Sequence, residues 1–517
     1  MKALRMRADS VPDGLWTLLS EFIAERTGLH FPRERRLDLE RGLAAAAAEF
    51  GFPDTAACAA WLLSSRPLTR PQLHTLASHL TVGETYFFRE RKAFAALAEH
   101  ILPELIRRRR GHEQRLRLWS AACSTGEEPY SLAILLHELL PDWDRWHVTI
   151  LATDINTRSL QKAAAGVYGE WSFRDAPSDL REQYFARTAD ERFAVAARIR
   201  KRVTFAQLNL AQDGFPSLAT DTNAMDVILC RNVLMYFTAP QARRLVENLG
   251  NSLLDDGWLC VSPSECSQSL FHRFAAVTFP GAILYRKPDT PEPSAPAQPP
   301  APTLAANEPA TLAFEAYRSS MQEAPGPTLA EHPGAEPDTR WAASSEPADP
   351  IAAAQALYTQ GRYAEAAEIL LPALAPTARA QCPPLAFSLL TRALANQGKL
   401  DDALAWSERW VAADKLNASP YYVRAMILQE LGDMKSARHC LQRAVYLQAD
   451  FALAHFALGN CARREAPGGG EKKHLDNALR LLRGRPPDEL VPESEGLTAG
   501  RLTEIICAVA SQTEFFK

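Results

Sequence analysis

The sequence predicts a mixed α/β protein with an N-terminal helical domain, a central doubly wound sheet and a C-terminal all-α domain. Three observations lead to this prediction. Apolar residues recur at helical spacing over residues 11–75. Strand-like and helix-like segments alternate from about residue 115, and a short motif recurs at intervals of 37 and 34 residues after residue 350.

Residues 1–80 form the predicted helical domain, in which LWTLLSEFIAERTGL shows the clearest helical periodicity. The basic residues near the N-terminus are not followed by a continuous apolar segment, so we expect no signal peptide. No stretch approaches the roughly 18 uncharged apolar residues that a membrane-spanning helix needs, and we expect no membrane insertion.

Residues 81–287 form the predicted sheet domain. Strands are predicted at LRLWSAA, HVTILATDIN, VTFAQLNL and MDVILC, with helices at EPYSLAILLHELL, TRSLQKAAAG and QARRLVENLGNSLL. Alternating strands and helices imply a parallel sheet with helices on its faces, and WLCVS and AILYRK are expected to close it as an antiparallel pair. Ligands of such sheets bind beyond the carboxyl ends of the strands.

Residues 288–349 are rich in Pro, Ala, Glu and Ser and contain few large apolar residues. A segment of this composition cannot bury enough apolar surface to order itself, so we predict a disordered linker. A flexible chain of about 60 residues would span roughly 40–45 Å.

Residues 350–485 contain the repeated motif, seen in QGRYAEAAEIL, QGKLDDALAWS and LGDMKSARHCL. Each copy has a glycine (Gly361, Gly398 or Gly432), an apolar residue two positions later and an alanine three positions further on. This pattern resembles tetratricopeptide repeats, which implies stacked helix pairs that bind a protein partner. Residues 486–517 are expected to be a C-terminal tail.

The composition restricts the classes of function. A net charge of −4, with 47% apolar and 23% charged residues, is typical of a soluble globular protein and does not favour nucleic-acid binding. The nine cysteines are scattered and form no CxxC pair, so we predict neither a metal site nor a disulfide framework. We infer a reducing, cytoplasmic environment.

The segment WSAACSTGEEPYSLAILL, residues 119–136, joins the first predicted strand to a helix. It has neither GxGxxG nor the P-loop pattern, so a pyrophosphate-bearing ligand is not favoured. Glu127 and Glu128 crowd the helix start and favour a cationic ligand group. Both also fit capping boxes that begin at Ser124 and Thr125, so either carboxylate could instead be structural.

Five motifs in this order resemble CheR-type chemoreceptor glutamate O-methyltransferases: ETYFFRE, the segment 119–136, ATDIN followed by GVY, LNL, and CRNVLMYF. The resemblance covers about residues 15–287. It implies S-adenosyl-L-methionine as the methyl donor, glutamates in the cytoplasmic helices of chemoreceptors as acceptors, and a small β-subdomain at about 166–205. The sequence departs from the family pattern at Gly83, where some members have Asn, and at Ser262-Pro263, where Gly-His is common.

The resemblance also implies the site residues. Thr85 and Arg89 would approach the methionine moiety and the methyl group of the cofactor, and Tyr236 would stand near the sulfonium. Since a guanidinium matches a carboxylate as a planar fork, Arg89 is also the best candidate to hold the acceptor carboxylate. Glu127 would bind the amino-acid end of the cofactor, Asp154 the ribose, and Asn209 with Leu210 the adenine side. The complete implied cofactor set is Gly83, Thr85, Arg89, Glu127, Asp154, Asn209, Leu210, Arg231 and Asn232. From the sequence alone, Arg89 could also be an exposed helix charge and Tyr236 a core aromatic.

Basic clusters occupy residues 31–41 and 105–117. They are either solvated helix faces or surfaces that guide acidic receptor helices to the site. Two other functions stay open: a signalling adaptor that binds the cofactor without turnover, and a methyltransferase for a non-receptor substrate. The pathway could serve motility, surface sensing or biofilm formation.

Overall fold

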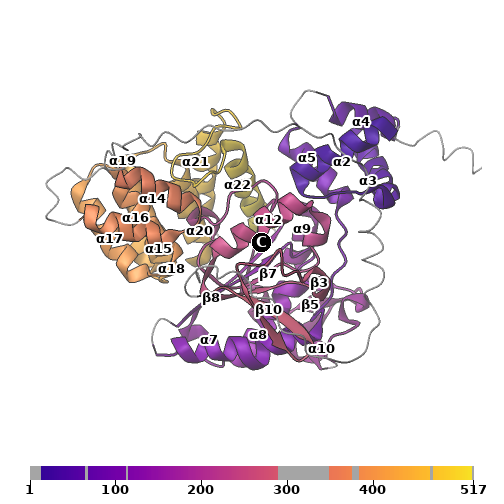
Figure 1. Ribbon diagram of the computed structural model, residues 1–517, viewed down its shortest axis with the longest axis horizontal. Coiled ribbons are helices and arrows are strands. Elements are labelled where there is room, and N and C mark those ends of the chain that lie inside the picture. The colour runs from indigo at the N-terminus through magenta and orange to yellow at the C-terminus, as the bar shows by residue number, and fades with distance from the viewer. Residues whose placement is uncertain are drawn as a thin grey trace, which may run out of the picture. The chain divides into compact units, whose positions relative to one another are not determined.

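The computed structural model describes residues 13–64, 68–111, 114–177, 179–288, 349–374, 384–465 and 470–514. Nearly all of the predicted linker therefore lies outside the described residues. The described residues on its two sides belong to one packed unit. Figure 1 labels the helices and strands.

The N-terminal helices form a small core of their own. They are α2 (Asp13–Thr27), α3 (Arg36–Phe50), α4 (Thr55–Leu62) and α5 (Arg70–Leu80), with a short 3-10 turn η1 (Arg33–Arg35). Their apolar faces meet at Leu19, Ile23, Leu39 and Leu43, all fully buried. Asp54 is the N-cap residue of α4, and its carboxylate accepts a hydrogen bond from the Ala57 N–H at 2.7 Å.

The central sheet has seven strands in the order β6-β2-β1-β7-β8-β10-β9. Their bounds are β1 Arg115–Ala121, β2 His147–Asp154, β6 Val203–Gln207, β7 Met225–Leu229, β8 Leu253–Cys260, β9 Ala275–Phe279 and β10 Ala282–Arg286. Strands β6, β2, β1, β7 and β8 run parallel, and β10 pairs antiparallel with β8 and β9. The predicted antiparallel closing pair is therefore confirmed. Strand β9 was not predicted from the sequence, and three of its five residues are exposed.

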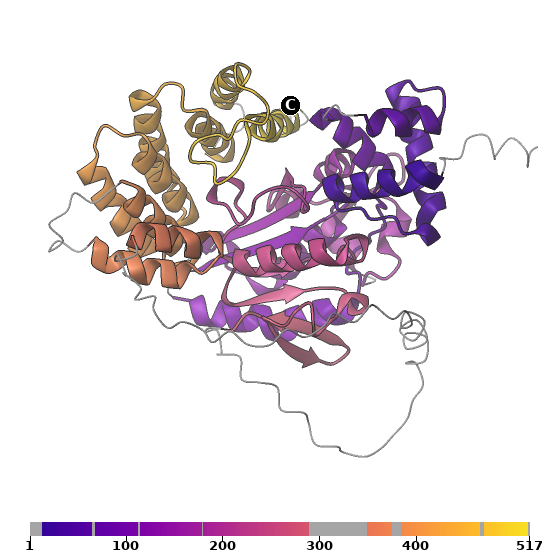
Figure 2. The same cartoon turned by 45° about the horizontal axis from the view of Figure 1, so that its top comes forward.

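Helices cover both faces of this sheet (Figure 2). Their bounds are α6 Arg91–Ala96, α7 Leu102–Arg109, α8 Glu127–Leu139, α9 Thr157–Ala165 and α12 Ala239–Ser252. Alternate residues of β1 point to opposite faces: Leu116 and Leu118 join a core with α7, α8 and α9, whereas Trp119 and Ala121 join a core with α12. The predicted doubly wound α/β class is confirmed.

A second, three-stranded sheet follows α9. It contains β3 (Val167–Tyr168), β4 (Phe185–Arg187) and β5 (Phe193–Val195) in the order β3-β5-β4. Short helical turns accompany it: η4 Glu170–Phe173, α10 Leu180–Tyr184 and α11 Ala197–Arg200. This is the small β-subdomain that the family resemblance implied.

The described residues of the C-terminal part form four helix pairs followed by one further helix. Their bounds are α14 Pro350–Thr359, α15 Tyr363–Ala373, α16 Pro384–Asn396, α17 Leu400–Ala413, α18 Ser419–Glu430, α19 Met434–Leu447, α20 Ala452–Glu465 and α21 Glu471–Leu482. The turns of the first three pairs contain Gly361, Gly398 and Gly432 at φ of 73°, 72° and 83°, a left-handed conformation that favours glycine. The repeated alanines, Ala366, Ala403 and Ala437, are fully buried between helices.

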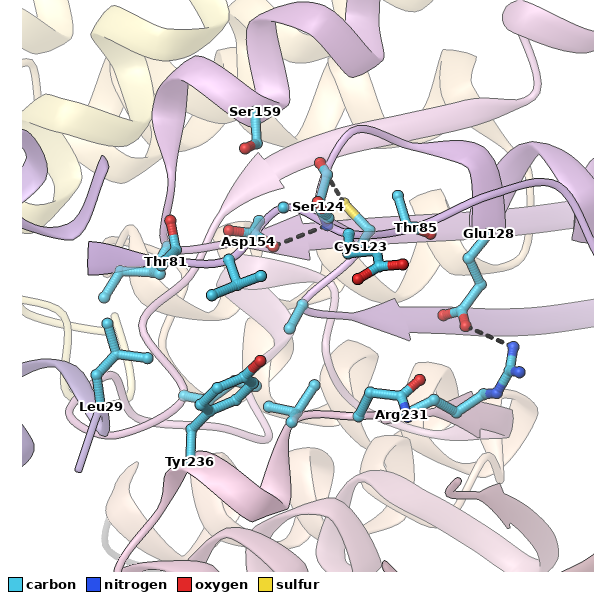
Figure 3. Close-up of a pocket in the computed structure, with 18 of the residues that line it drawn as sticks. Leu29, Thr81, Thr85, Cys123, Ser124, Glu128, Asp154, Ser159, Arg231 and Tyr236 are labelled. Atoms are coloured by element: carbon cyan, nitrogen blue, oxygen red, sulfur yellow. Dashed lines mark hydrogen bonds and ion pairs between the residues drawn. The ribbon is translucent and has the colours of Figure 1, made fainter. Parts of the chain in front are cut away.

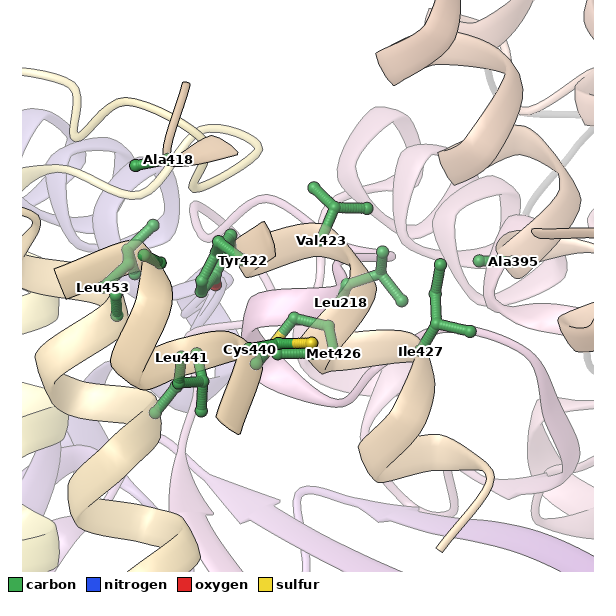
Figure 4. Packing of buried hydrophobic residues seen from close by; sticks show 14 of the residues in the cluster. Leu218, Ala395, Ala418, Tyr422, Val423, Met426, Ile427, Cys440, Leu441 and Leu453 are labelled. Atoms are coloured by element: carbon green, nitrogen blue, oxygen red, sulfur yellow. The ribbon is translucent and has the colours of Figure 1, made fainter. Parts of the chain in front are cut away.

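The predicted C-terminal tail contains a further helix, α22 (Ala499–Glu514), whose Leu502 and Ile506 are fully buried. Its apolar residues recur at helical spacing, which is the signal that could have predicted it. The buried core of the repeats also includes Leu218, a residue of the sheet domain (Figure 4). Among the described helices, none combines the length and apolar character needed to cross a bilayer.

The repeats pack directly on the sheet domain through their turn glycines. A Cβ placed on Gly361 would collide with the side chain of Asn251, and one on Gly398 would lie 2.7 Å from Leu254. Close by, the buried carboxylate of Glu430 pairs with Arg115 at 3.2 Å. These contacts, and not the estimated reach of the linker, therefore fix the position of the repeats on the sheet domain.

Candidate active site

A pocket opens beyond the carboxyl ends of β1, β2 and β7, where a doubly wound sheet binds its ligands (Figure 3). It brings together every predicted site residue except Glu127. These residues are Gly83, Thr85, Arg89, Asp154, Asn209, Leu210, Arg231, Asn232 and Tyr236. Segments separated by about 150 residues in the sequence thus meet at one edge of the sheet.

Of the two glutamates at the start of α8, Glu128 and not the predicted Glu127 lines the pocket. Glu127 is 3% exposed and lies outside the pocket lining, where its carboxylate accepts hydrogen bonds from Thr125 Oγ1 at 2.7 Å and Ser172 Oγ at 2.9 Å. Burial raises the pKa of this carboxyl group. Glu128 lines the pocket. Consecutive helical residues point about 100° apart, so only one of the two can face the ligand.

Neither glutamate caps the helix. The N-cap residue of α8 is Gly126, at φ 94°, and no side chain caps this end. Instead, Glu128 accepts a hydrogen bond from Ser120 Oγ at 2.7 Å and pairs with Arg231 at 2.9 Å. The capping-box alternative is therefore wrong, and both carboxylates are held by neighbouring side chains.

Asp154 stands at the end of β2 with free acceptor capacity. Its carboxylate accepts hydrogen bonds from the main-chain N–H groups of Ser124 and Asn156, each at 2.8 Å. No ion pair of Asp154 occurs among the described residues. A carboxylate with spare lone pairs in a pocket suits two adjacent ribose hydroxyls. Burial raises the pKa of Asp154, and the two N–H groups oppose this shift only in part.

We expect Asp154→Asn to weaken binding of S-adenosylhomocysteine by roughly 10–100-fold, the value of one or two hydrogen bonds to a charged group. Because its pKa is raised, Asp154 takes up its proton at a higher pH than a free aspartate. The affinity of the wild type for S-adenosylhomocysteine should therefore be full above this pKa and should fall as the pH drops through it. Calorimetric titration of both proteins across a pH series would measure these effects. Equal affinity of the two proteins at neutral pH would contradict the assignment.

The ETYFFRE segment is held in place by its central aromatic residue. Phe87 is fully buried and packs against the rings of Tyr168, Phe173 and Phe185 in the β-subdomain, at centroid distances of 4.9–5.0 Å. This packing fixes the main chain on which Arg89 stands. The Arg89 guanidinium lines the pocket and donates to the Glu84 main-chain oxygen at 2.7 Å.

Arg231 connects two walls of the pocket. Its side chain is 2% exposed and pairs with Glu90 at 3.0 Å and with Glu128 at 2.9 Å. It also donates a hydrogen bond to the main-chain oxygen of Arg89. Burial alone would lower the pKa of Arg231, but the two carboxylates outweigh it and raise the pKa. The positive charge of Arg231 is thus compensated within the protein, whereas Arg89 has no ion-pair partner among the residues that the structure describes.

The segment after β7 depends on Glu265, a residue that the sequence interpretation did not assign to the site. The buried carboxylate of Glu265 accepts hydrogen bonds from the N–H groups of Asn232 and Val233, both at 2.7 Å. Asn232 has φ 58°, a conformation that needs such support. The capping box Ser262-x-x-Glu265 is the sequence signal that could have identified this residue.

Tyr236 lies between the pocket and the N-terminal helices. The Arg35 guanidinium lies 5.0 Å from the centroid of the Tyr236 ring. The main-chain oxygen of Tyr236 accepts a hydrogen bond from the His30 N–H at 2.7 Å. At the part of the pocket where adenine is expected, the Asn209 side chain donates to the Arg26 main-chain oxygen at 2.7 Å and accepts from the Ala211 N–H at 3.0 Å. The N-terminal helices therefore contribute directly to two walls of the pocket.

The pocket fits an adenosine joined to a zwitterionic amino acid. Within the described part of the chain, Ser124 Oγ is buried in the lining and has no hydrogen-bond partner, so it is available to a ligand. Small residues, including Gly83 and Ala122, leave room beside it. Asp154 offers acceptors for a ribose, and the carboxylates and arginines of the lining suit an ammonium and a carboxylate, respectively.

The two basic clusters behave differently. In residues 105–117, arginines pair with acidic residues: Arg109 with Asp226, Arg110 with Asp142 and Arg115 with Glu430. This cluster is mainly structural. In residues 31–41, Arg35 adjoins the pocket through Tyr236, although it also pairs with Asp38 at 3.4 Å.

Comparison with known proteins gives two family matches. The model described as CheR methyltransferase, SAM binding domain, matches residues 83–281, and a tetratricopeptide repeat model matches residues 418–451. Chemotaxis protein methyltransferase 2 of Vibrio cholerae serotype O1 is 36% identical over 217 residues, which cover 42% of this chain and 74% of that protein. Chemotaxis protein methyltransferase 1 of Pseudomonas aeruginosa is 36% identical over 211 residues, covering 40% and 74% of the two chains.

A longer alignment is found with the "Probable biofilm formation methyltransferase WspC" of Pseudomonas aeruginosa. The two chains are 30% identical over 407 residues, which cover 77% of this chain and 84% of that protein. An alignment of this length extends beyond the sheet domain into the C-terminal part. The similarity to that protein therefore includes the region of the repeats as well as the pocket.

Proposed function

Since this chain belongs to the CheR family of chemotaxis methyltransferases, whose cofactor is S-adenosylmethionine, we propose that it methylates glutamate side chains of chemoreceptors. The acceptors would be glutamates in the cytoplasmic helices of methyl-accepting receptors, and the products would be glutamate methyl esters. One observation carries the proposal. Arg89 lines the pocket that also contains Asp154, and it has no ion-pair partner among the described residues.

The proposed acceptor requires little acid–base chemistry. A glutamate side chain, with a pKa of about 4.3, is already ionised at neutral pH, so its oxygen can act as a nucleophile without a general base. The bound cofactor supplies a methyl group on a positively charged sulfur. The task of the protein is then to align the carboxylate with that methyl group, and alignment can supply several kcal/mol.

Arg89 is the proposed catalytic residue for this alignment. A guanidinium matches a carboxylate as a planar fork with two donors, and the hydrogen bond from Arg89 to the Glu84 oxygen restricts its position. Glu128 takes the ligand-facing role that Glu127 was expected to have, next to the ammonium of the cofactor. Tyr236 would cover the sulfonium side of the pocket.

We propose that the basic cluster at residues 31–41 guides the acceptor to the pocket. Arg35 connects this cluster to Tyr236 at the pocket, so an acidic receptor helix drawn to it would arrive close to the reaction centre. Such attraction acts over a Debye length of about 8 Å at physiological ionic strength and would weaken with added salt.

We expect a receptor cytoplasmic fragment to become labelled when it is incubated with this protein and S-adenosylmethionine that carries a tritiated methyl group. The label should be released as methanol in mild base, because a carboxyl methyl ester hydrolyses under conditions that leave N-methyl and ether groups intact. Replacing the receptor glutamates with alanine should abolish the labelling. Vapour-phase capture of tritiated methanol would measure the release.

The same assay distinguishes the two other functions. A base-stable label would contradict esterification and favour a different acceptor chemistry. Tight cofactor binding with no labelled receptor would favour a signalling adaptor. Label that is transferred to other proteins, but not to receptors, would favour a non-receptor substrate.

The repeats are proposed to bind a further protein and thereby select where methylation occurs. The long alignment with a relative named for biofilm formation supports a chemosensory pathway of that type. We also propose a cytoplasmic location, which suits the cysteines: those within the described residues, Cys58, Cys123, Cys230, Cys260, Cys266, Cys440, Cys461 and Cys507, are all free thiols.

A further inference from the structure

The segment that follows the repeats returns to the cofactor pocket. Helix α22 packs against β6, the strand that leads into the adenine side of the pocket. From this helix, Arg501 reaches into the sheet domain with a side chain that is only 4% exposed. A buried arginine needs several acceptors, and here they come from Gln207 at the end of β6, from Asp213 and from Glu504 of the same helix.

Arg501 contacts the two residues that flank the adenine-side loop. It donates to both oxygens of Gln207, the main-chain oxygen and, at 2.9 Å, Oε1. It pairs with Asp213 Oδ2 at 2.9 Å, and the Asp213 side chain is 10% exposed. Between these contacts lie Leu208, Asn209 and Leu210, which line the pocket.

Asp213 Oδ2, the oxygen that pairs with Arg501, also contacts the loop. Asp213 Oδ2 accepts a hydrogen bond from the Asn209 N–H at 2.6 Å. A continuous path of polar contacts therefore runs from the C-terminal helix through Asp213 to the main chain of a pocket residue. Removal of the guanidinium would leave Asp213 as an uncompensated, nearly buried charge and would free the loop to move.

The C-terminal segment also holds the far end of this stretch of chain. Glu495 accepts a hydrogen bond from the Leu218 N–H at 2.8 Å and another from the Tyr358 hydroxyl at 2.7 Å, and it pairs with Arg392 at 3.1 Å. Leu218 belongs to the sheet domain, whereas Tyr358 and Arg392 belong to the repeats. Residues 207–218 are thus fixed at one end by Arg501 and at the other by Glu495.

We propose that Arg501 is a positioning residue for the adenine-side loop, so that the segment beyond the repeats sets the affinity of the enzyme for its cofactor. Arg501 does not line the pocket. It acts through Gln207 and Asp213, which fix the main chain at Asn209. The proposal rests on the cofactor pocket of the proposed function, but not on the identity of the methyl acceptor.

The test uses the full-length protein and S-adenosylhomocysteine as the probe. We expect Arg501→Ala to raise the Kd of this ligand about tenfold and to raise the KM for S-adenosylmethionine similarly, with kcat within twofold of wild type. Arg501→Lys should restore part of the affinity, because an ammonium can still pair with Asp213 but cannot also donate to both Gln207 oxygens. Isothermal calorimetry and initial rates measure these values.

The matched control is Arg485→Ala, which removes an arginine of the same segment from an ion pair with Glu489 that is partly exposed to solvent. This variant should keep the wild-type Kd. If Arg501→Ala does not fold, Asp213→Asn removes the same ion pair with almost no change of shape, and it should raise the Kd in the same direction.

A Kd unchanged in folded Arg501→Ala, or in Asp213→Asn if the first variant does not fold, would overturn the proposal. A loss of kcat with an unchanged KM would also overturn it, because that result would indicate a role outside cofactor binding. The binding measurement needs no receptor. If the wild type binds the cofactor product but methylates no receptor, the proposed acceptor is wrong, and the role of Arg501 is still decided by the Kd values.

Discussion

Replacing Arg89 with alanine is expected to lower the rate of methyl transfer by about 10²–10³-fold, which is the usual cost of removing one donor that stabilises the reacting group. The Kd for the cofactor should change little. Arg89 is held by the Glu84 main-chain oxygen and anchored through the buried ring of Phe87, so its guanidinium is already placed before the acceptor arrives. The measurement is initial-rate labelling of a receptor fragment, with calorimetry for the cofactor.

Two variants make this result specific to the position of Arg89. Arg89→Lys keeps the charge but loses the planar fork, and it should recover only part of the rate. Arg107→Ala removes an arginine whose side chain is 72% exposed and which pairs with Glu104 on the surface, and it should react like the wild type. Wild-type rates for Arg89→Ala would show that another group holds the acceptor.

Replacing Glu430 with alanine is expected to reduce the free energy of unfolding by about 3–5 kcal/mol, the usual cost of removing one partner from a buried ion pair. Glu430 and Arg115 are both 4% exposed, and their charged groups lie 3.2 Å apart between α18 and β1. The other carboxylate oxygen accepts from the Asn223 amide at 2.9 Å. The variant would leave the buried Arg115 charge without its ion-pair partner.

The control for Glu430 lies in the same repeats. Glu408 pairs with Arg424 at 2.8 Å but is 54% exposed, so Glu408→Ala should cost less than about 1 kcal/mol. Urea denaturation followed by far-UV circular dichroism and tryptophan fluorescence would measure both variants. A cost for Glu430→Ala as small as that of Glu408→Ala would contradict a buried, structurally essential pair between the repeats and the sheet domain.

Much of the fold could be predicted because burial leaves a periodic record in the sequence. Leu116 and Leu118 face one core and Trp119 and Ala121 face the other, so apolar residues on both faces mark this segment as a strand inside the sheet. The repeat glycines could be identified for a similar reason, because each turn needs a left-handed residue. Helix α22 lies in the segment predicted as a C-terminal tail, although its apolar residues show helical periodicity.

Most of the residues that line the pocket could be named in advance only because they stand in motifs whose order resembles that of a known family. What such motifs cannot supply is the direction of each side chain. Glu127 and Glu128 are adjacent in the sequence, and only the geometry of α8 determines that the second one lines the pocket. Glu265 and Arg501 act through the main chain of other residues, and contacts of this kind leave no local pattern.

The turn glycines of the repeats have a consequence for the modularity of this protein. Solenoid repeats are usually regarded as exchangeable units, because each one contacts only its neighbours. Here Gly361 and Gly398 satisfy two demands at once: a left-handed turn within their own repeat and close approach to Asn251 and Leu254 of another domain. A chimera that carries a foreign repeat array would therefore inherit the turn but not the matching surface, so the repeats and the catalytic domain are expected to evolve as a matched pair.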